Sequence, residues 1–343
     1  MIIRTAKPSD LEALLALSAM LPPGMTSMPC DTQTWEKKLQ LVSDSISRQP
    51  QDGQESVYLL VLEDPTNNAI VGTAGIISGV GNTRSFYNYK MSKEVKTSPD
   101  INIKRSSNLL NLVNDYTGAT ELTSLFLMPE YRRNGAGQFL SRCRFVFMND
   151  FPERFDDMVF AEIRGWLDEN EESPFWNHLG QKFFKLPFHK ADFISSVNGS
   201  QFISDLMPRF PVYLELLPQE AIEVIGRAHR DAAPAQRLLE KEGFSYNGAV
   251  DIFDAGPIVE CDRGEIRSIQ NTTTARIKSI TDSVNDNSES PLCIVSNRNL
   301  SEYRLITSRI ENPIENEIAI SAQDAKMLHV DVGSQIQMLQ MRH

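Results

Sequence analysis

A β-strand, a glycine-rich turn and a helix follow one another without a break between residues 121 and 151. The segment Glu121–Leu127 (ELTSLFL) has the composition of a strand, and Met128-Pro129 ends it. Next come Arg132-Arg133-Asn134-Gly135-Ala136-Gly137, and then apolar residues that recur at helical spacing. Glycines where a helix begins let backbone N–H groups converge, and the helix N-terminus adds partial positive charge. The stretch therefore predicts a binding site for an anionic group such as a pyrophosphate.

Two common nucleotide motifs do not fit this turn. A Walker loop requires Gly-Lys-Ser/Thr, where the chain has Gln138-Phe139, and a dinucleotide fingerprint requires a third glycine where Leu140 stands. The pattern that fits is Arg-x-x-Gly-x-Gly, formed by Arg132, Gly135 and Gly137. It resembles the pyrophosphate loop of the GNAT superfamily of acyl-CoA N-acyltransferases. On these six residues alone, a plain strand-to-helix turn with solvated arginines explains the pattern equally well.

The composition is that of a soluble globular protein with two or three domains, since 41% of the 343 residues are hydrophobic and 23% are charged. Strands at Ser56–Asp64, Ala69–Ser78 and Met158–Ile163 alternate with helices, and two helices are expected to end at glycine caps, Gly180 and Gly243. Residues 268–290 are polar and predict an exposed connection with one short strand. Three regions are predicted: residues 1–155 (acyl-CoA binding), 156–264 (completing the active site) and 265–343 (β-rich).

The net charge of −11 argues against a nucleic-acid or membrane partner, because both favour a basic surface. It permits a small anionic ligand held by a local cationic loop. The four cysteines are far apart and form no Cys-x-x-Cys pair, so isolated thiols are expected and no metal site. The N-terminal residues lack the pattern of a secretory signal, and no apolar run is long enough to cross a bilayer, so we expect a cytoplasmic protein.

Longer stretches carry a more specific resemblance. They are Asn114–Gly137, Ser173–Gly180, Lys190–Tyr213 and Ile225–Asp262. With them the chain resembles the arginine N-succinyltransferase family nearly from end to end. The resemblance implies an α/β (α+β), GNAT-like fold with a mixed, largely antiparallel sheet flanked by helices, plus a small C-terminal β-rich domain.

The activity that the resemblance implies is transfer of the succinyl group of succinyl-CoA to the α-amine of L-arginine. The products are N2-succinyl-L-arginine and CoA, in the first step of arginine catabolism by the succinyltransferase pathway. Succinyl-CoA is a cosubstrate, and no cofactor is implied. Attack by the α-amine agrees with elementary chemistry, because the guanidinium stays protonated whereas the α-amine titrates near neutrality.

Site residues follow from the same resemblance. Leu125 binds succinyl-CoA through its backbone, His229 donates a proton to the departing thiolate, and the pyrophosphate is held by Arg132, Arg133, Asn134, Gly135, Ala136, Gly137 and Gln138. The residue types leave other contacts open. Candidates to bind the guanidinium are Asp115, Glu121, Glu162, Asp251 and Asp254. Arg164 could face either the substrate carboxylate or the succinyl tail, and Lys90 and Arg133 are candidates for the succinyl carboxylate.

Two alternatives keep the fold and change the role. The acceptor could be another amine such as ornithine, or the chain could be a catalytically silent acyl-CoA-binding subunit of a hetero-oligomer. The intact segment around His229 disfavours the silent subunit, which has no chemical need for that histidine. A homo- or hetero-oligomer is expected in either case.

Overall fold

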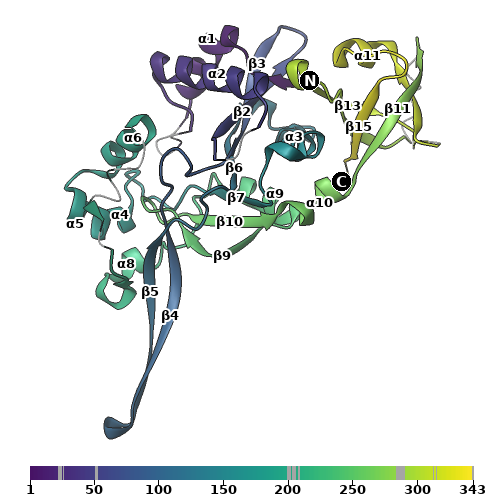
Figure 1. Cartoon of the computed structure of the whole chain (residues 1–343). Coiled ribbons are helices and arrows are strands. Elements are labelled where there is room, and N and C mark those ends of the chain that lie inside the picture. The colour runs from purple at the N-terminus through teal and green to yellow at the C-terminus, as the bar shows by residue number, and fades with distance from the viewer. Residues whose placement is uncertain are drawn as a thin grey trace.

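The computed structural model describes the chain except for residues 22–24, 26, 51–52, 199–201, 203–205, 208, 283–289, 312, 314 and 342–343. Within the described residues one continuous mixed sheet runs through the molecule, in the strand order β14-β11-β15-β12-β13-β1-β2-β3-β6-β7-β10-β9-β4-β5-β8 (Figure 1). Its strands are β1 (Ile2–Thr5), β2 (Ser56–Asp64), β3 (Ala69–Ser78), β4 (Asn88–Ser98), β5 (Ile103–Val113), β6 (Thr120–Leu127), β7 (Met158–Glu162), β8 (Val212–Tyr213), β9 (Ser245–Val250), β10 (Pro257–Asp262), β11 (Thr272–Thr281), β12 (Leu292–Ser296), β13 (Arg304–Arg309), β14 (Glu317–Ser321) and β15 (Gln335–Gln340). Only β6–β7 and β11–β14 pair in parallel among them.

Helices cover both faces of this sheet. They are α1 (Leu11–Ser18), α2 (Thr32–Ser47), α3 (Ala136–Asp150), α4 (Pro174–His178), α5 (Gly180–Phe184), α6 (Phe188–Asn198), α8 (Gln219–Ile222), α9 (Ala233–Glu242), α10 (Arg267–Gln270) and α11 (Ala322–Leu328). Successive side chains of β2 point to opposite faces of the sheet. Leu59 and Val61 pack with α1 and α2 on one face, whereas Leu60 and Leu62 pack with α3 on the other. The arrangement confirms the α/β class that the sequence predicts.

Several predicted elements lie where the sequence placed them. Strands β2 and β3 occupy the predicted residues, and the strand–turn–helix unit is β6 followed by α3. Helix α9 ends at Gly243, whose φ of +112° is the left-handed conformation that favours glycine.

The prediction for Gly180 was wrong. Helix α4 ends at His178, Leu179 is its C-cap, and Gly180 instead begins α5. A Cβ at Gly180 would lie 2.2 Å from the ring of Trp176, so glycine is required there by the close approach of the indole.

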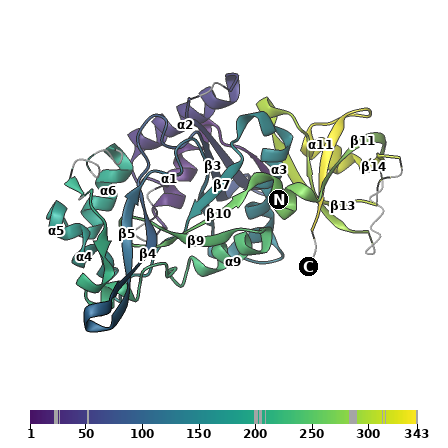
Figure 2. The ribbon, with the colours of Figure 1, turned by 60° about the horizontal axis from the view of Figure 1, so that its bottom comes forward.

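The C-terminal residues continue the sheet of the N-terminal part. Strand β13 pairs with β1 in the antiparallel sense, and β12, β15, β11 and β14 follow in order (Figure 2). Within the polar segment 268–290, β11 is ten residues long, longer than the short strand predicted there. The three predicted domain boundaries remain a prediction.

One element that the sequence did not predict is a long hairpin of β4 and β5. It leaves the body of the molecule and projects away from every other element (Figure 1). The two strands pair with each other from Asn88–Val113 to Ser98–Ile103.

Candidate active site

A bulge interrupts β6 beside Leu125. The register with β3 runs from Thr73–Phe126 to Gly75–Thr123, so Ser124 and Leu125 have no partner in this ladder. On its other edge β6 pairs with β7 only at Thr120 and Glu121. Leu125 therefore lies outside both strand ladders, where β6 and β7 diverge.

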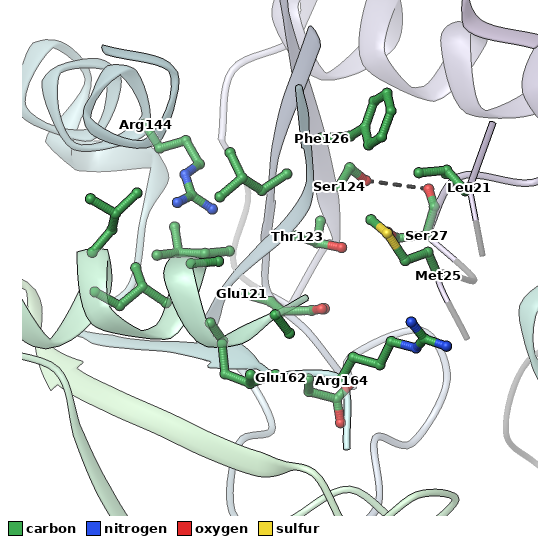
Figure 3. Close-up of a pocket in the computed structure, with 18 of the residues that line it drawn as sticks. Leu21, Met25, Ser27, Glu121, Thr123, Ser124, Phe126, Arg144, Glu162 and Arg164 are labelled. Carbon is green, nitrogen blue, oxygen red and sulfur yellow. Dashed lines mark hydrogen bonds between the residues drawn. The ribbon is translucent and has the colours of Figure 1, made fainter. Parts of the chain in front are cut away.

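Hydrogen bonds hold the bulge in place. Ser124 has a φ of +51°, a costly conformation for a residue with a Cβ. Its hydroxyl donates to the carbonyl of Ser27 (3.2 Å) and accepts from Lys38 Nζ (3.0 Å), and its carbonyl accepts from Thr73 Oγ1 (2.7 Å) (Figure 3). Lys38 is half-buried, and the loss of water around its ammonium lowers its pKa to about 8.

The glycine turn forms the start of α3, as predicted. Asn134 and Gly135 have φ of +52° and +78°, which turns the chain from β6 into the helix. Among the described residues, the N–H groups of Gly137 and Gln138 have no hydrogen-bond acceptor. A Cβ built at Gly137 would meet no atom within 4 Å, so the protein alone does not require glycine there. These features are those of an anion site at a helix N-terminus.

A single cavity of about 1040 Å³ joins the glycine turn to the bulge. Its walls include residues Thr123 to Leu127 of β6 and residues 132–138 of the turn, all the residues that the resemblance assigned to succinyl-CoA. At its other end lie the ends of β7 and of β9 and the aromatic side chains Phe86, Tyr87, Phe188 and Phe253. The volume is of the size expected for a site that holds a large cosubstrate and a small one.

The end of the cavity away from the turn is rich in carboxylates: Glu55, Glu121, Glu162, Asp251 and Asp254. Burial raises the pKa of Glu121 to about 7, although the charge of Lys38 acts the other way. Burial, followed by the negative charge of Asp251, raises the pKa of Glu162 well above its usual value. The same two causes raise the pKa of Asp254 to about 8, against N–H donors from Gly165 and Gly256. A cation at this end would favour the ionised carboxylates.

Two of the arginines that line the cavity, Arg144 and Arg164, lie on opposite sides of Glu121 and Glu162 in the view of Figure 3. The guanidinium of Arg164 bonds Glu171 through Nη2 (2.5 Å), and its Nε is buried without a partner among the described residues. Arg144, on α3, is 1% exposed and its recorded hydrogen bonds go to Ser141. Burial lowers the pKa of Arg144 to about 10.

His229 lies one layer behind the cavity wall. Its flanking neighbours Arg164 and Asp231 line the cavity, whereas His229 is only 5% exposed and does not. The backbone N–H of His229 donates a hydrogen bond to the backbone carbonyl of Arg164 (2.8 Å). The ring Nδ1 of His229 accepts a hydrogen bond from the backbone N–H of Asp231 (3.2 Å). With Nδ1 accepting, the neutral ring carries its proton on Nε2. Burial, and then the charge of Arg164, lower the pKa of this imidazole.

The structure brings together four of the five carboxylates considered for the guanidinium. Asp115 does not line the cavity, and neither does Lys90, whereas Arg133 does. Arg144 and Lys38 were missed by sequence reasoning. An arginine within the apolar run of α3 was the available signal for Arg144, and Lys38 carried none.

Among the described residues, no group of three or more His, Cys, Asp or Glu side chains is arranged so that it could hold a metal ion. None of the described helices is both long and apolar enough to span a bilayer.

The fold and the site together define an α/β protein with an anion-binding turn after a bulged strand. The family model for the arginine N-succinyltransferase beta subunit matches residues 1–268. Arginine N-succinyltransferase of Escherichia coli (strain 55989 / EAEC) is 35% identical over 99% of this chain and 98% of that protein. The enzyme of the same name from Shigella flexneri is 37% identical over 96% of this chain and 95% of that protein.

A solved structure agrees over the whole chain. Arginine/ornithine succinyltransferase subunit AI from Pseudomonas aeruginosa superposes with a TM-score of 0.89 at 29% identity, covering 100% of this chain and 99% of that one. The chain belongs to the arginine N-succinyltransferase family. The predicted family is confirmed, and so is the predicted α/β fold class with a mixed sheet flanked by helices.

Proposed function

We propose that this chain transfers the succinyl group of succinyl-CoA to the α-amine of L-arginine, giving N2-succinyl-L-arginine and CoA. The observation that carries the proposal is one cavity with an anion-binding turn at one end and a cluster of carboxylates at the other. A CoA thioester matches the first end and a cationic amino acid the second. The bulged strand lies between them, where acyl transfer would take place.

The donor is proposed to bind along β6 and the turn. The pyrophosphate accepts hydrogen bonds from the backbone N–H groups of Gly137 and Gln138. These two residues belong to the proposed pyrophosphate loop, which consists of Arg132, Arg133, Asn134, Gly135, Ala136, Gly137 and Gln138. The backbone of Leu125, outside both strand ladders, donates to the thioester carbonyl. A donor there stabilises the oxyanion that forms as the carbonyl carbon becomes tetrahedral.

The acceptor is proposed to bind at the carboxylate end. Glu162 and Asp251 face the guanidinium, and Glu121 receives a proton from the α-amine. A carboxyl whose pKa is about 7 is suited to that transfer at neutral pH, because it is neither fully ionised nor fully protonated there. The amine nitrogen bonds the carbonyl carbon, the C–S bond breaks, and the sulfur leaves as thiolate.

His229 is proposed to act as the imidazolium, which gives its Nε2 proton to that thiolate and becomes the neutral ring. In the imidazolium Nδ1 carries the second proton and faces the carboxylate of Asp231 (3.7 Å), and the ring regains its proton from solvent after turnover. Its position behind Arg164 and Asp231 requires that the thiolate approach through the gap between these two residues, or that one water molecule connect them. Arg164 is our choice to bind a substrate carboxylate, because its buried Nε has no partner among the described residues. Arg133 remains a candidate for the succinyl carboxylate.

Release of free thiol from acyl-CoA tests the proposal. Purified protein should release thiol from succinyl-CoA with L-arginine and not with acetyl-CoA or without an acceptor. Equal release with L-ornithine would favour the alternative acceptor, which the name of the Pseudomonas aeruginosa relative includes. No release with either amine, despite binding of succinyl-CoA, would favour a silent subunit. A cytoplasmic location and an oligomeric state remain part of the proposal.

A further inference from the structure

The hairpin of β4 and β5 has few strand pairings with the rest of its own chain, and the described side-chain contacts of its projecting part include those of Glu94 and Lys96 with Tyr213. Strand β4 pairs with β9 only at Tyr89 and Lys90, and β5 pairs with β8 only at Leu109 and Leu110. Beyond these pairs, residues 91–108 pair only with each other, and none of them is buried. Figure 1 shows the two strands leaving the body together, with no other element beside their tip.

A two-stranded ribbon of this kind is marginally stable in water by itself. Both of its edges present unpaired backbone groups, and exposed edges are template surfaces for another chain. Three large apolar side chains near the tip are exposed: Val95 (51%), Ile101 (65%) and Ile103 (52%). A ribbon that is extended, open-edged and apolar at its tip has the properties of a surface that a partner covers.

The charge of the hairpin opposes the charge of the rest of the chain. Residues 88–113 contain five Lys and Arg against two Asp and Glu, a net charge of +3. The whole chain carries −11, so the remaining residues carry −14. An acidic partner is therefore favoured, and the body of another copy of this chain is one.

A complementary surface lies at the base of the same hairpin. It contains the two most exposed large apolar side chains of the described residues, Phe210 (84%) and Leu216 (80%). The carboxylates of Glu215, Glu220 and Glu223 are exposed around Leu216, on the segment that leads into and through α8. We call residues 210–223 the base surface. It adjoins the hairpin because β8, within it, pairs with β5.

We propose that the β4–β5 hairpin is a dimerisation arm that docks on the base surface of a second copy of this chain. A two-fold axis accounts for both surfaces at once, because two arms lying antiparallel place each tip at the partner's base. Eight residues of strand reach roughly 25 Å at about 3.3 Å per residue, which is enough to cross to a neighbouring molecule. The proposal is independent of the reaction that the cavity carries out.

Sedimentation equilibrium of the purified chain tests the dimer. The wild-type chain should be a dimer at micromolar concentration. Replacing Lys93–Asn108 by Asn-Gly joins Ser92 to Leu109, which are paired residues, by a two-residue turn. This variant should be a monomer with the far-UV circular dichroism and succinyl-CoA binding of a folded protein.

A charge exchange tests the docking partner. Lys104→Glu with Arg105→Glu reverses the arm, and Glu215→Lys with Glu223→Lys reverses the base surface. Each double variant should be monomeric alone, because like charges then face each other in its homodimer. An equimolar mixture should form a dimer, in which arms and base surfaces have opposite charges again.

Three results would overturn the proposal. The first is a wild-type chain that stays monomeric even at a concentration 100-fold above the micromolar range. That result is also expected if the arm binds only a different protein. The second is a dimer that persists in the shortened variant, since the interface then lies elsewhere. The third is a mixture of the two charge variants that stays monomeric.

Discussion

Glu162 and its neighbours make arginine binding depend on pH in a direction that can be worked out. Burial and the charge of Asp251 raise the pKa of Glu162, so the free enzyme holds a proton that a bound guanidinium displaces. Affinity for arginine should therefore increase as pH rises, and binding should release protons. Calorimetry in two buffers of different ionisation enthalpy measures that release.

The matched variants are Glu162→Gln and Asp115→Asn. The first should weaken arginine binding at least 10-fold and flatten its pH dependence, whereas the second changes a carboxylate outside the cavity and should change neither. Equal effects of the two substitutions would show that net charge, and not the pocket, attracts arginine.

A second prediction concerns the replacement of His229. His229→Ala should lower kcat by about 10²- to 10⁴-fold, the range that general acid–base groups contribute, with little change in the KM for succinyl-CoA. His178→Ala is the control, since His178 ends helix α4 and pairs with Glu220 away from the cavity. Full turnover by His229→Ala would remove this histidine from the mechanism.

Among the elements, the turn between β6 and α3 allows ligand binding to be separated from folding. Gly135 has a φ of +78°, so Gly135→Ala should destabilise the protein by about 1 kcal/mol. The methyl group that Gly137→Ala adds would meet no protein atom, so the melting temperature of this variant should not change. Its methyl group would occupy the space proposed for the pyrophosphate, and the KM for succinyl-CoA should rise at least 10-fold. An unchanged KM would place the pyrophosphate elsewhere.

The same elements show what a sequence can reveal. Strands β2 and β3 were predictable because apolar residues run without interruption between clear turn signals, and α3 because glycines precede a helical period. The projecting part of the β4–β5 hairpin was not, since Lys, Ser and Asn are frequent in residues 92–108 and no apolar face marks a strand there. Gly180 was assigned to the wrong role because a cap and a close ring contact require the same residue.

For the molecule as a whole, the predictable part of the site was the part contiguous in sequence. Residues 125 and 132–138 lie on one strand and one turn, so their common location followed from the chain. The carboxylates come from the residue before β2, from β6 and β7, and from the residues after β9, and only the sheet order places these segments around one cavity. The position of His229 behind Arg164 is likewise a tertiary contact that no spacing indicates.

The structure of the product tests the central claim most directly. Arginine has two kinds of nitrogen. We propose that the α-amine attacks the thioester while the carboxylates keep the guanidinium protonated. The product of arginine and succinyl-CoA should therefore be a single compound whose NMR spectrum shows the succinyl amide on the α-nitrogen and an unmodified guanidinium. Succinyl on a guanidino nitrogen, or no arginine adduct at all, would contradict the account.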